Sequence, residues 1–466
     1  MGILEVKPDQ AVAGKPFTIS TETGSNLAPN TSYQLTWSTA DATWNLDPEA
    51  DTVNYLGRSA TYFNVVLTTV RTDASGQFSV TLNAPADFGG IHDIYVVANG
   101  EEDAHGGFIL MRTFSISPTS GPVGTPITVT YTGLGDTLYT GGASLLYDNH
   151  YVGEMMANWT RGTARAVIRA AGSVGPHLIQ IGNAISYLYL NVPQSPIPYT
   201  NGGTATFTIT KDDGPPPARI DWPVNVQPTV TARTTLQTAG LATSNSIDAS
   251  LTSTRGPVDS RISVLASGLT PGDPVQLVWS TVVGNRVNCA STCWAFTSQD
   301  LDPVTPNAAG EIDQRVTVPD GLGGWHVVQV MEGSNVLAQL PFYVEESIVG
   351  KGVSSLTVKE GQLFTIHLKG IGWTQLDNTV AVDYDNSYMG YACGFNSNGD
   401  VVIDLHAAGG PGTHLIDLYP MLYTLSPSFA NAPYGMVPLL TYAKDDPALA
   451  LGYHLGALRF AITVVK

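Results

Sequence analysis

The chain has 466 residues, 39 of them acidic and 21 basic, which gives a formal net charge of −18. A field of this sign repels phosphate backbones and anionic lipid, so we expect neither nucleic acid nor a membrane surface as a partner. Only 13% of the residues are charged, and 48 glycines and 30 prolines indicate a β-rich chain with many turns.

No run of 18 apolar residues occurs, so no membrane span is expected. The chain opens with Met-Gly and a strand-like ILEV, without the charged and apolar segments of a signal peptide. We expect an extracellular or cell-surface protein whose leader has been removed. A cytoplasmic protein is the alternative.

Residues 1–113 predict a first immunoglobulin-like domain, which we name domain A. Apolar and polar residues alternate in SYQLTWST and HDIYVVANG, and Gly, Asn and Pro separate these strands at short spacing, as a β-sandwich requires. Between Ala40 and Val70 we expect a longer, loop-rich stretch.

Residues 114–212, domain B, open with FSISPTSGPVGTPITVTYTGLG. This opening resembles the IPT/TIG-type immunoglobulin-like domains of bacterial surface proteins, in which a similar Ser-Pro, Gly-Pro-x-Gly-Thr and Gly-x-Gly pattern occurs. The matching residues are Ser117, Pro118, Ser120, Gly121, Pro122, Gly124, Thr125, Thr128 and Gly133. The resemblance implies a sandwich fold and a surface setting.

Residues 213–257 read as a connector between two halves. Three consecutive prolines make its start stiff, and the Thr/Ser-rich remainder has weak apolar periodicity, although part of it could add an edge strand to a neighbour. Residues 258–347 then repeat domain A, with VQLVWST matching YQLTWST; we name them domain A′. Residues 348–466 repeat domain B and form domain B′.

The repeat is clearest between Tyr147–His177 and Tyr384–His414. Asp148 and Asp385 differ by 237 positions (385 minus 148), and His177 and His414 differ by the same number (414 minus 177). The sequence therefore predicts an all-β chain of four immunoglobulin-like sandwiches, A-B-connector-A′-B′, produced by duplication of a two-domain unit.

The repeated Asp148/His177 and Asp385/His414 pairs are candidates for an acid–base pair or for metal ligands. No Gly-x-Ser-x-Gly motif supplies a nucleophile. Domains A and A′ place histidines at the same point, in GGIH and GGWH, but lack the aspartate. This pattern favours a structural role: the aspartate would cap a turn, and the histidine would be a half-buried strand residue.

Cys289 and Cys293 form a C-x3-C pair that could close a small disulfide, while unpaired thiols are the alternative. A zinc site is not expected, because no second ligand pair lies nearby. No cofactor is expected. A calcium ion at a loop end, near Asp47 and Asp51 or near Asp445 and Asp446, is the alternative.

Aromatic residues in predicted loops are the remaining candidates for a binding site. They could stack on sugars or anchor a protein partner, or they could fill the ends of sandwiches and domain junctions. The residues predicted to bind a ligand are Trp44, Tyr55, Tyr62, Trp294 and Phe296.

No phosphate loop, zincin motif or nucleotide-binding glycine pattern occurs, so we predict a protein that is not an enzyme. The expected function is structural or adhesive, on a cell surface or within a larger assembly, with protein partners or self-association into a filament. A carbohydrate-binding module that uses the aromatic loops of A and A′, and a hydrolase with an unrecognised site, are the alternatives.

Overall fold

Every regular element that the computed structural model describes is a β-strand. The description covers residues 1–49, 52–137, 140–157, 160–182, 190, 203–222, 245–284, 294–350, 356–373, 378–422, 437–441 and 456–466. The side chains at 43–59, 284–296, 422 and 437 lie outside it.

Domain A is a sandwich whose two layers are joined through β1. The larger layer has the order β5-β4-β7-β8, with β1 and β2 running parallel to β8, and the smaller layer has the order β1-β3-β6. The strands are β1 (Gly2–Lys7), β2 (Gln10–Val12), β3 (Pro16–Thr21), β4 (Ser32–Glu49), β5 (Thr52–Arg71), β6 (Ser79–Asn83), β7 (Gly90–Ala98) and β8 (Glu101–Met111).

Domain B has a five-stranded layer, β10-β16-β15-β12-β13, and a three-stranded layer, β14-β11-β9. Its strands are β9 (Thr113–Ser117), β10 (Ser120–Gly121), β11 (Pro126–Thr132), β12 (Gly142–Tyr147), β13 (His150–Met156), β14 (Ala164–Arg169), β15 (Gly175–Gly182) and β16 (Gly203–Ile209). The short strand β10 pairs in parallel with the last strand of the domain, as β2 does in domain A.

Domain A′ repeats this arrangement with the layers β19-β25-β24-β21-β22 and β18-β20-β23. Its strands are β18 (Asp248–Leu251), β19 (Arg255–Pro257), β20 (Arg261–Ser267), β21 (Gln276–Gly284), β22 (Trp294–Asp300), β23 (Ile312–Thr317), β24 (Gly324–Glu332) and β25 (Asn335–Glu345).

Domain B′ has the layers β17-β34-β32-β29-β30 and β26-β28-β31, with β27 beside β34 and β33 beside β32. Its strands are β26 (Ser347–Ile348), β27 (Thr357–Lys359), β28 (Leu363–Lys369), β29 (Thr379–Tyr384), β30 (Ser387–Cys393), β31 (Val401–His406), β32 (Gly412–Leu422), β33 (Val437–Pro438) and β34 (Ala457–Val465). The strand orders confirm the predicted fold class: an all-β chain of four sandwiches from a duplicated two-domain unit.

The segment predicted as a connector contributes strands to domains A′ and B′. β17 (Arg219–Asp221) pairs with β34 of domain B′, and β18 and β19 pair with β20 and β25 of domain A′. Domain A′ therefore takes up chain that the sequence placed in the connector. These strands are three or four residues long and lie at sheet edges, which explains their weak apolar periodicity.

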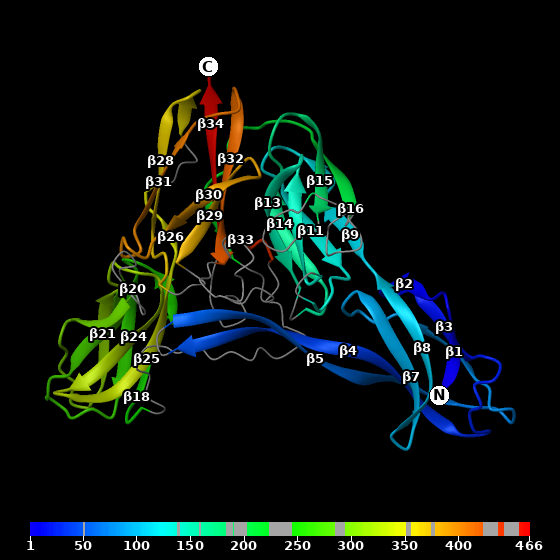
Figure 1. Cartoon of the computed structure of the whole chain (residues 1–466). Helices are drawn as coiled ribbons and strands as arrows, with labels where there is room; N and C mark the ends of the chain where they lie inside the picture. The colour runs from blue at the N-terminus through cyan, green and yellow to red at the C-terminus, as the bar shows by residue number, and fades with distance from the viewer. Residues whose placement is uncertain are drawn as a thin grey trace.

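The stretch between Ala40 and Val70, predicted as rich in loops, is instead most of a long hairpin. β4 and β5 have 18 and 20 residues, against 9 and 7 in the equivalent β21 and β22. The hairpin projects well beyond the rest of domain A (Figure 1). Many β-branched and aromatic residues suit both strands, so the prediction of loops was wrong.

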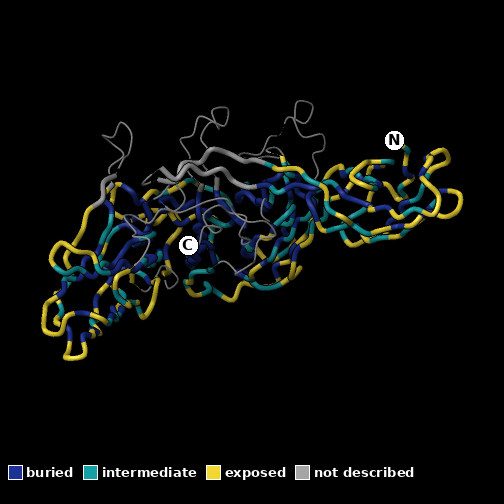
Figure 2. The backbone as a smooth tube through the Cα atoms, turned by 90° about the horizontal axis from the view of Figure 1, so that it is seen from below, coloured by how far each residue is buried: buried dark blue, intermediate teal, exposed yellow. Residues whose placement is uncertain are grey.

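Domains B and B′ lie side by side, with A and A′ at opposite ends of the molecule (Figure 1), and buried backbone gathers in the middle (Figure 2). One hydrophobic cluster contains both the core of domain B and residues of B′, among them Ala381, Leu415, Tyr419 and Ala461. Their neighbours Val380, Val382, Ile416 and Leu418 belong to the separate core of B′. The larger sheet of B′ is therefore buried on both faces.

Two arginines cross this boundary with their side chains at most 1% exposed. Arg169 of β14 donates to the Asp417 carboxylate and to the Phe460 carbonyl, and Arg459 donates to Asp221 and to the Val167 carbonyl. Burial of charges costs free energy unless they are paired. Arg169 is paired with a carboxylate of B′, whereas Arg459 is paired within the B′ sheet and reaches domain B through the Val167 carbonyl. The two halves thus share one interior.

A short segment of B′, residues 437–441, lies between the two larger sheets. The amide of Leu440 donates to the Glu154 carbonyl of β13 over 2.9 Å, and the amide of Leu439 donates to the Pro420 carbonyl of β32 over 2.8 Å. The sheet of B thereby continues, through this segment, into the sheet of B′.

Candidate ligand site at the junction of domains A and B

The same backbone contact joins the two domains of each half. The amide of Gly89 donates to the Leu134 carbonyl over 2.9 Å, and the amide of Gly323 donates to the Ile371 carbonyl over 2.9 Å. A Cβ at Gly89 would lie 1.9 Å from the Gly133 oxygen, and a Cβ at Gly323 would lie 1.7 Å from the Gly370 oxygen. Only glycine permits this close approach of the two backbones, so the A/B and A′/B′ junctions share the same backbone contact.

In the second half, large apolar side chains fill this junction. Val282, Leu322, Trp373 and Phe395 form a buried cluster there. The indole of Trp373 donates to the carbonyl of Trp325 over 3.2 Å, and Trp373 is only 3% exposed. The A′/B′ junction is therefore closed by packed apolar side chains.

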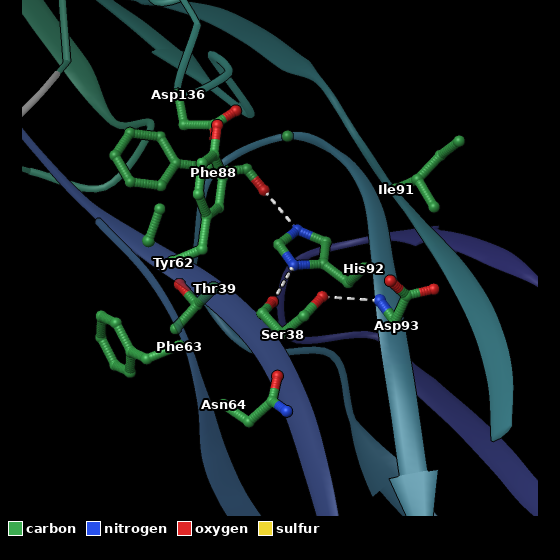
Figure 3. Close-up of a pocket in the computed structure, with 12 residues that line it drawn as sticks. Ser38, Thr39, Tyr62, Phe63, Asn64, Phe88, Ile91, His92, Asp93 and Asp136 are labelled. Carbon is green, nitrogen blue, oxygen red and sulfur yellow. Dashed lines mark hydrogen bonds between the residues drawn. The ribbon is translucent and has the colours of Figure 1, made fainter. Parts of the chain in front are cut away.

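In the first half, the positions of the two tryptophans carry a polar and a smaller residue. Asp136 takes the place of Trp373, at the offset of 237 (373 minus 136), and Ile91 takes the place of Trp325, at the offset of 234 (325 minus 91). A hollow of about 480 Å³ lies here (Figure 3). It is lined by Ser38, Thr39, Ala40, Tyr62, Phe63, Asn64, Phe88, Gly89, Ile91, His92, Asp93 and Asp136.

Tyr62 of β5 and Ile91 of β7 present apolar surface at this hollow, with exposed fractions of 68% and 78%. Asp136, from the loop of domain B above them, accepts a hydrogen bond from the Tyr62 phenol, and this bond, with some burial, raises the pKa of Tyr62. The bond fixes one edge of the tyrosine ring. A single aromatic face is therefore held beside a carboxylate.

Below the hollow, the polar groups of domain A are held by one another. The two ring nitrogens of His92 each lie 2.7 Å from a carbonyl oxygen, one of Ser38 and one of Phe88 (Figure 3). The Ser38 hydroxyl accepts from the amide of Asp93 over 2.7 Å. His92 is 5% exposed and stacks on Trp37. It therefore packs beneath the hollow, and its ring does not face a ligand.

The hollow continues onto the outer face of the larger sheet of domain A. Here Ile91 pairs with Ile109, which is 41% exposed, and Asp93 pairs with Gly107. The equivalent residues of A′ are Trp325, Tyr343, Val327 and Pro341, and Val327 and Tyr343 are at most 2% exposed. The face of A is open and partly polar, whereas the face of A′ is apolar, with Val327 and Tyr343 buried and Trp325 and Pro341 half-buried.

Arg161 of domain B closes one side of the first junction. Its guanidinium lies 2.7 Å from the Asp41 carboxylate and 5.7 Å from the centroid of the Phe63 ring. This cation neutralises Asp41 and covers Phe63. Asp93 and Asp136 remain as the carboxylates that line the hollow.

Of the residues predicted to bind a ligand, the structure brings Tyr62 into this site. The side chains of Trp44, Tyr55, Trp294 and Phe296 lie outside the described residues, and so do those of Asp47 and Asp51. The proposed disulfide between Cys289 and Cys293 also lies outside them. Asp136, Ile91 and Asn64 were not predicted. The signal for Asp136 was available, since the aligned copies carry Asp at 136 and Trp at 373.

The repeated Asp–His pairs are part of the frame of domains B and B′. Asp148 accepts from His177 over 2.6 Å and from the amide of Leu178, and Asp385 binds His414 and the amide of Leu415 in the same way. Both aspartates sit in hairpin turns at a φ of 49°.

Each of the four equivalent histidines also lies against the carbonyl four residues before it and stacks on the aromatic residue of the neighbouring strand. The geometry supports the structural interpretation of these pairs.

The environments of these histidines nevertheless differ. Burial lowers the pKa of His326 to about 4, because no carboxylate compensates for it. Burial also acts to lower the pKa of His414, but the hydrogen bond and the charge of Asp385 outweigh it and raise that pKa above its usual value.

Among the described residues, no group of three His, Cys, Asp or Glu side chains could hold a metal ion. The loops named as calcium candidates, around Asp47 and Asp51 and around Asp445 and Asp446, fall outside this search. Nor does any described segment form a helix long and apolar enough to cross a membrane.

No protein-family profile matches the chain, and no curated protein matches it. Among solved structures, the native E. coli alpha-2-macroglobulin aligns with 98% of this chain at 10% identity and a TM-score of 0.17. A Salmonella alpha-2-macroglobulin mutant aligns at 10% identity and a TM-score of 0.18. The chain spans 30% of the length of each. The four-domain ectodomain fragment of ICAM-5 aligns with 91% of this chain, over 95% of its own, at 12% identity and a TM-score of 0.18. Scores this low carry no inference about function.

Proposed function

We propose that the chain is a structural or adhesive protein displayed outside the cell, and that it binds its partner without catalysing a reaction. The observation that carries this proposal is the contrast between the two outer faces. The face of domain A is open beside a hollow, while its duplicate in A′ is apolar and largely covered. Exposed apolar surface next to polar groups is characteristic of binding surfaces.

Three further features support the proposal. The four sandwiches, and the resemblance of residues 114–212 to IPT/TIG-type domains of surface proteins, fit an extracellular setting. The shared interior of B and B′ and the backbone contacts at Gly89 and Gly323 fix the domains relative to one another. In the Asp–His pairs, the aspartates bind the histidine rings and backbone amides of their own domains, which leaves these pairs unsuited to proton transfer.

The location is tested by labelling cells of the source organism with an antibody raised against the chain. We expect intact cells to be labelled as strongly as permeabilised ones. Labelling that appears only after permeabilisation would contradict an extracellular protein.

The binding face is tested with beads that carry the purified chain, incubated with cells of the source organism. Gly107 lies on the open face, and a Cβ there meets no atom within 4 Å, so Gly107→Trp should block the face without a clash at Cβ. We expect this variant to lose adhesion. Ser79→Trp, on an exposed position of β6 in the opposite layer, is the matched control and should keep it. Equal adhesion by both variants would refute the proposed face.

A further inference from the structure

We infer that the hollow at the A/B junction is a binding site for a neutral carbohydrate, whose ring stacks on Tyr62 and whose hydroxyl groups bond to Asp136, Asn64 and Asp93. This inference rests on the proposed function, since it names the ligand class of the same surface. The hollow has a volume of about 480 Å³, which lies in the range of small-ligand sites, roughly 300 to 1,000 Å³.

The charge of the hollow excludes anionic ligands. Asp93 and Asp136 line it, and the nearest described cation, Arg161, is engaged with Asp41. A phosphate, sulfate or uronate would meet two carboxylates in a chain of net charge −18. Sugar acids and sulfated glycans are therefore excluded.

The polarity of the hollow excludes purely apolar ligands. Carboxylate, amide and hydroxyl groups of Asp136, Asn64 and Ser38 line the hollow (Figure 3). An apolar ligand would remove water from the Asp136 carboxylate and the Asn64 amide without replacing its hydrogen bonds, which costs free energy. A ligand with hydroxyl groups at its edge satisfies them.

The aromatic geometry separates a sugar from a cation. Recognition of an ammonium or guanidinium group is strongest where several aromatic faces surround it. Here the Phe63 ring already faces the Arg161 guanidinium and the Phe88 ring is only 3% exposed, so Tyr62, at 68%, is the aromatic side chain most open to a ligand. One fixed aromatic face, with hydrogen-bonding groups at its edge, suits the flat apolar face of a pyranose ring.

The duplicate junction gives an internal comparison for this site. At the position of Asp136 it carries Trp373, which is 3% exposed and occupies the space that would be the hollow. The same backbone contact therefore exists with and without the cavity, and the residues at the positions of Trp373 and Trp325 distinguish the two junctions.

The test uses the purified full chain on an array that presents neutral oligosaccharides, sulfated and uronic oligosaccharides, and lysine- and arginine-containing peptides. Any neutral oligosaccharide that binds is then titrated by calorimetry. We expect binding to neutral oligosaccharides only. Tyr62→Ala should weaken it by about tenfold or more, and Tyr62→Phe, which keeps the ring, by roughly two- to threefold.

Asp136→Trp, which copies the residue of the filled junction, should abolish binding, while Ser79→Trp should leave it unchanged. Near-ultraviolet circular dichroism of each variant shows whether the fold is kept, and Tyr62→Ala supplies an independent result if Asp136→Trp does not fold. Binding that survives both Tyr62→Ala and Asp136→Trp overturns the site.

Binding only to basic peptides or only to anionic glycans overturns the ligand class, and so does the absence of any bound oligosaccharide. Labelling of intact cells does not depend on this result. A chain that is displayed on the surface but binds no sugar would refute the inference and leave the proposed location standing.

Discussion

The A/B and A′/B′ junctions have the same backbone and different contents. Each is closed by a glycine amide that donates to a carbonyl of the following domain over 2.9 Å. Around this contact, the second junction packs Trp373 and Phe395, whereas the first leaves a hollow beside Tyr62 and Asp136. The interdomain angle is thus set by main-chain contacts, and side chains were free to diverge after duplication.

This difference shows where one copy of a duplicated two-domain unit can acquire a binding site and still keep the backbone contact between its domains. The filled junction contributes hydrophobic burial, and the open one gives up that contribution. The first half compensates in part with the Arg161–Asp41 ion pair and with the Ala40, Ala42 and Phe88 cluster.

The largest effect is expected when the filled junction is given the residue of the open one. Trp373→Asp removes a buried indole and leaves a carboxylate among Val282, Leu322 and Phe395, so we expect a loss of about 3 to 5 kcal/mol in the free energy of unfolding. Urea denaturation measures it. Trp373→Phe is the control and should destabilise the chain less. The lost hydrogen bond to the Trp325 carbonyl should cost roughly 1 kcal/mol, in addition to the cost of replacing the indole with a smaller ring. A Trp373→Asp variant as stable as the parent would show that the cluster does not hold the junction.

The next effect concerns the frame that the two junctions share. Gly89→Ala and Gly323→Ala would place a Cβ within 1.9 Å and 1.7 Å of a carbonyl oxygen, so each junction must open. We expect similar costs of about 1 to 3 kcal/mol and a changed small-angle scattering profile for both variants. Gly107→Ala, which meets open space, is the control. If one glycine tolerates alanine and the other does not, the two frames are not equivalent.

A smaller effect separates the equivalent histidines. His326 has a folded pKa of about 4, below the value of about 6.5 usual for an unfolded chain. Its contribution to stability is therefore present above pH 6.5 and decreases as the pH falls from there toward 4. His414 has a raised folded pKa, so its contribution is present below pH 6.5 and is lost as the pH rises through that folded pKa.

NMR titration of the imidazole protons, assigned with His326→Gln and His414→Gln, measures both values. We expect His326 to be neutral at pH 5 and His414 to titrate above 6.5. If the two rings titrated at the same pH, this would contradict the conclusion that burial lowers the pKa of His326 and that Asp385 raises the pKa of His414.

The smallest effect is confined to the open junction. Asp136→Asn removes the carboxylate that accepts from the Tyr62 phenol, so the pKa of Tyr62 should fall toward its ordinary value. NMR of ring-labelled tyrosine measures the change, with Tyr62→Phe to assign the signal. An unchanged pKa would show that the two side chains do not interact in solution.

Much of the fold was predictable because its signals are local. Strands with one buried face alternate with a period of two, and turn residues separate them, so sandwiches followed from SYQLTWST and HDIYVVANG. The constant offset of 237 positions between the two copies, as between Asp148 and Asp385, indicated the duplication. The long hairpin was missed because Asp, Asn and Pro in DATWNLDPEAD indicate a loop, although aromatic and β-branched residues surround them.

The site was predictable only in part. Tyr62 stood out as an aromatic residue in a polar stretch, but Asp136 lies in another domain and meets it only through the packing of A on B. No local pattern reports such a contact. The same holds for Arg169, Asp417 and Arg459, which alternate along their strands as surface charges do but face the boundary between B and B′.

The contact between Arg169 and the Phe460 carbonyl spans 291 residues of sequence. A ribosome adds about 5 to 20 residues per second, so on the order of 15 to 60 s pass between synthesis of the two. Domain A is complete well before then. Domain B has to wait with Arg169 unpaired and with the apolar surface that B′ later covers exposed to water. In the cell, the second domain of this chain is therefore the one that depends longest on protection from aggregation.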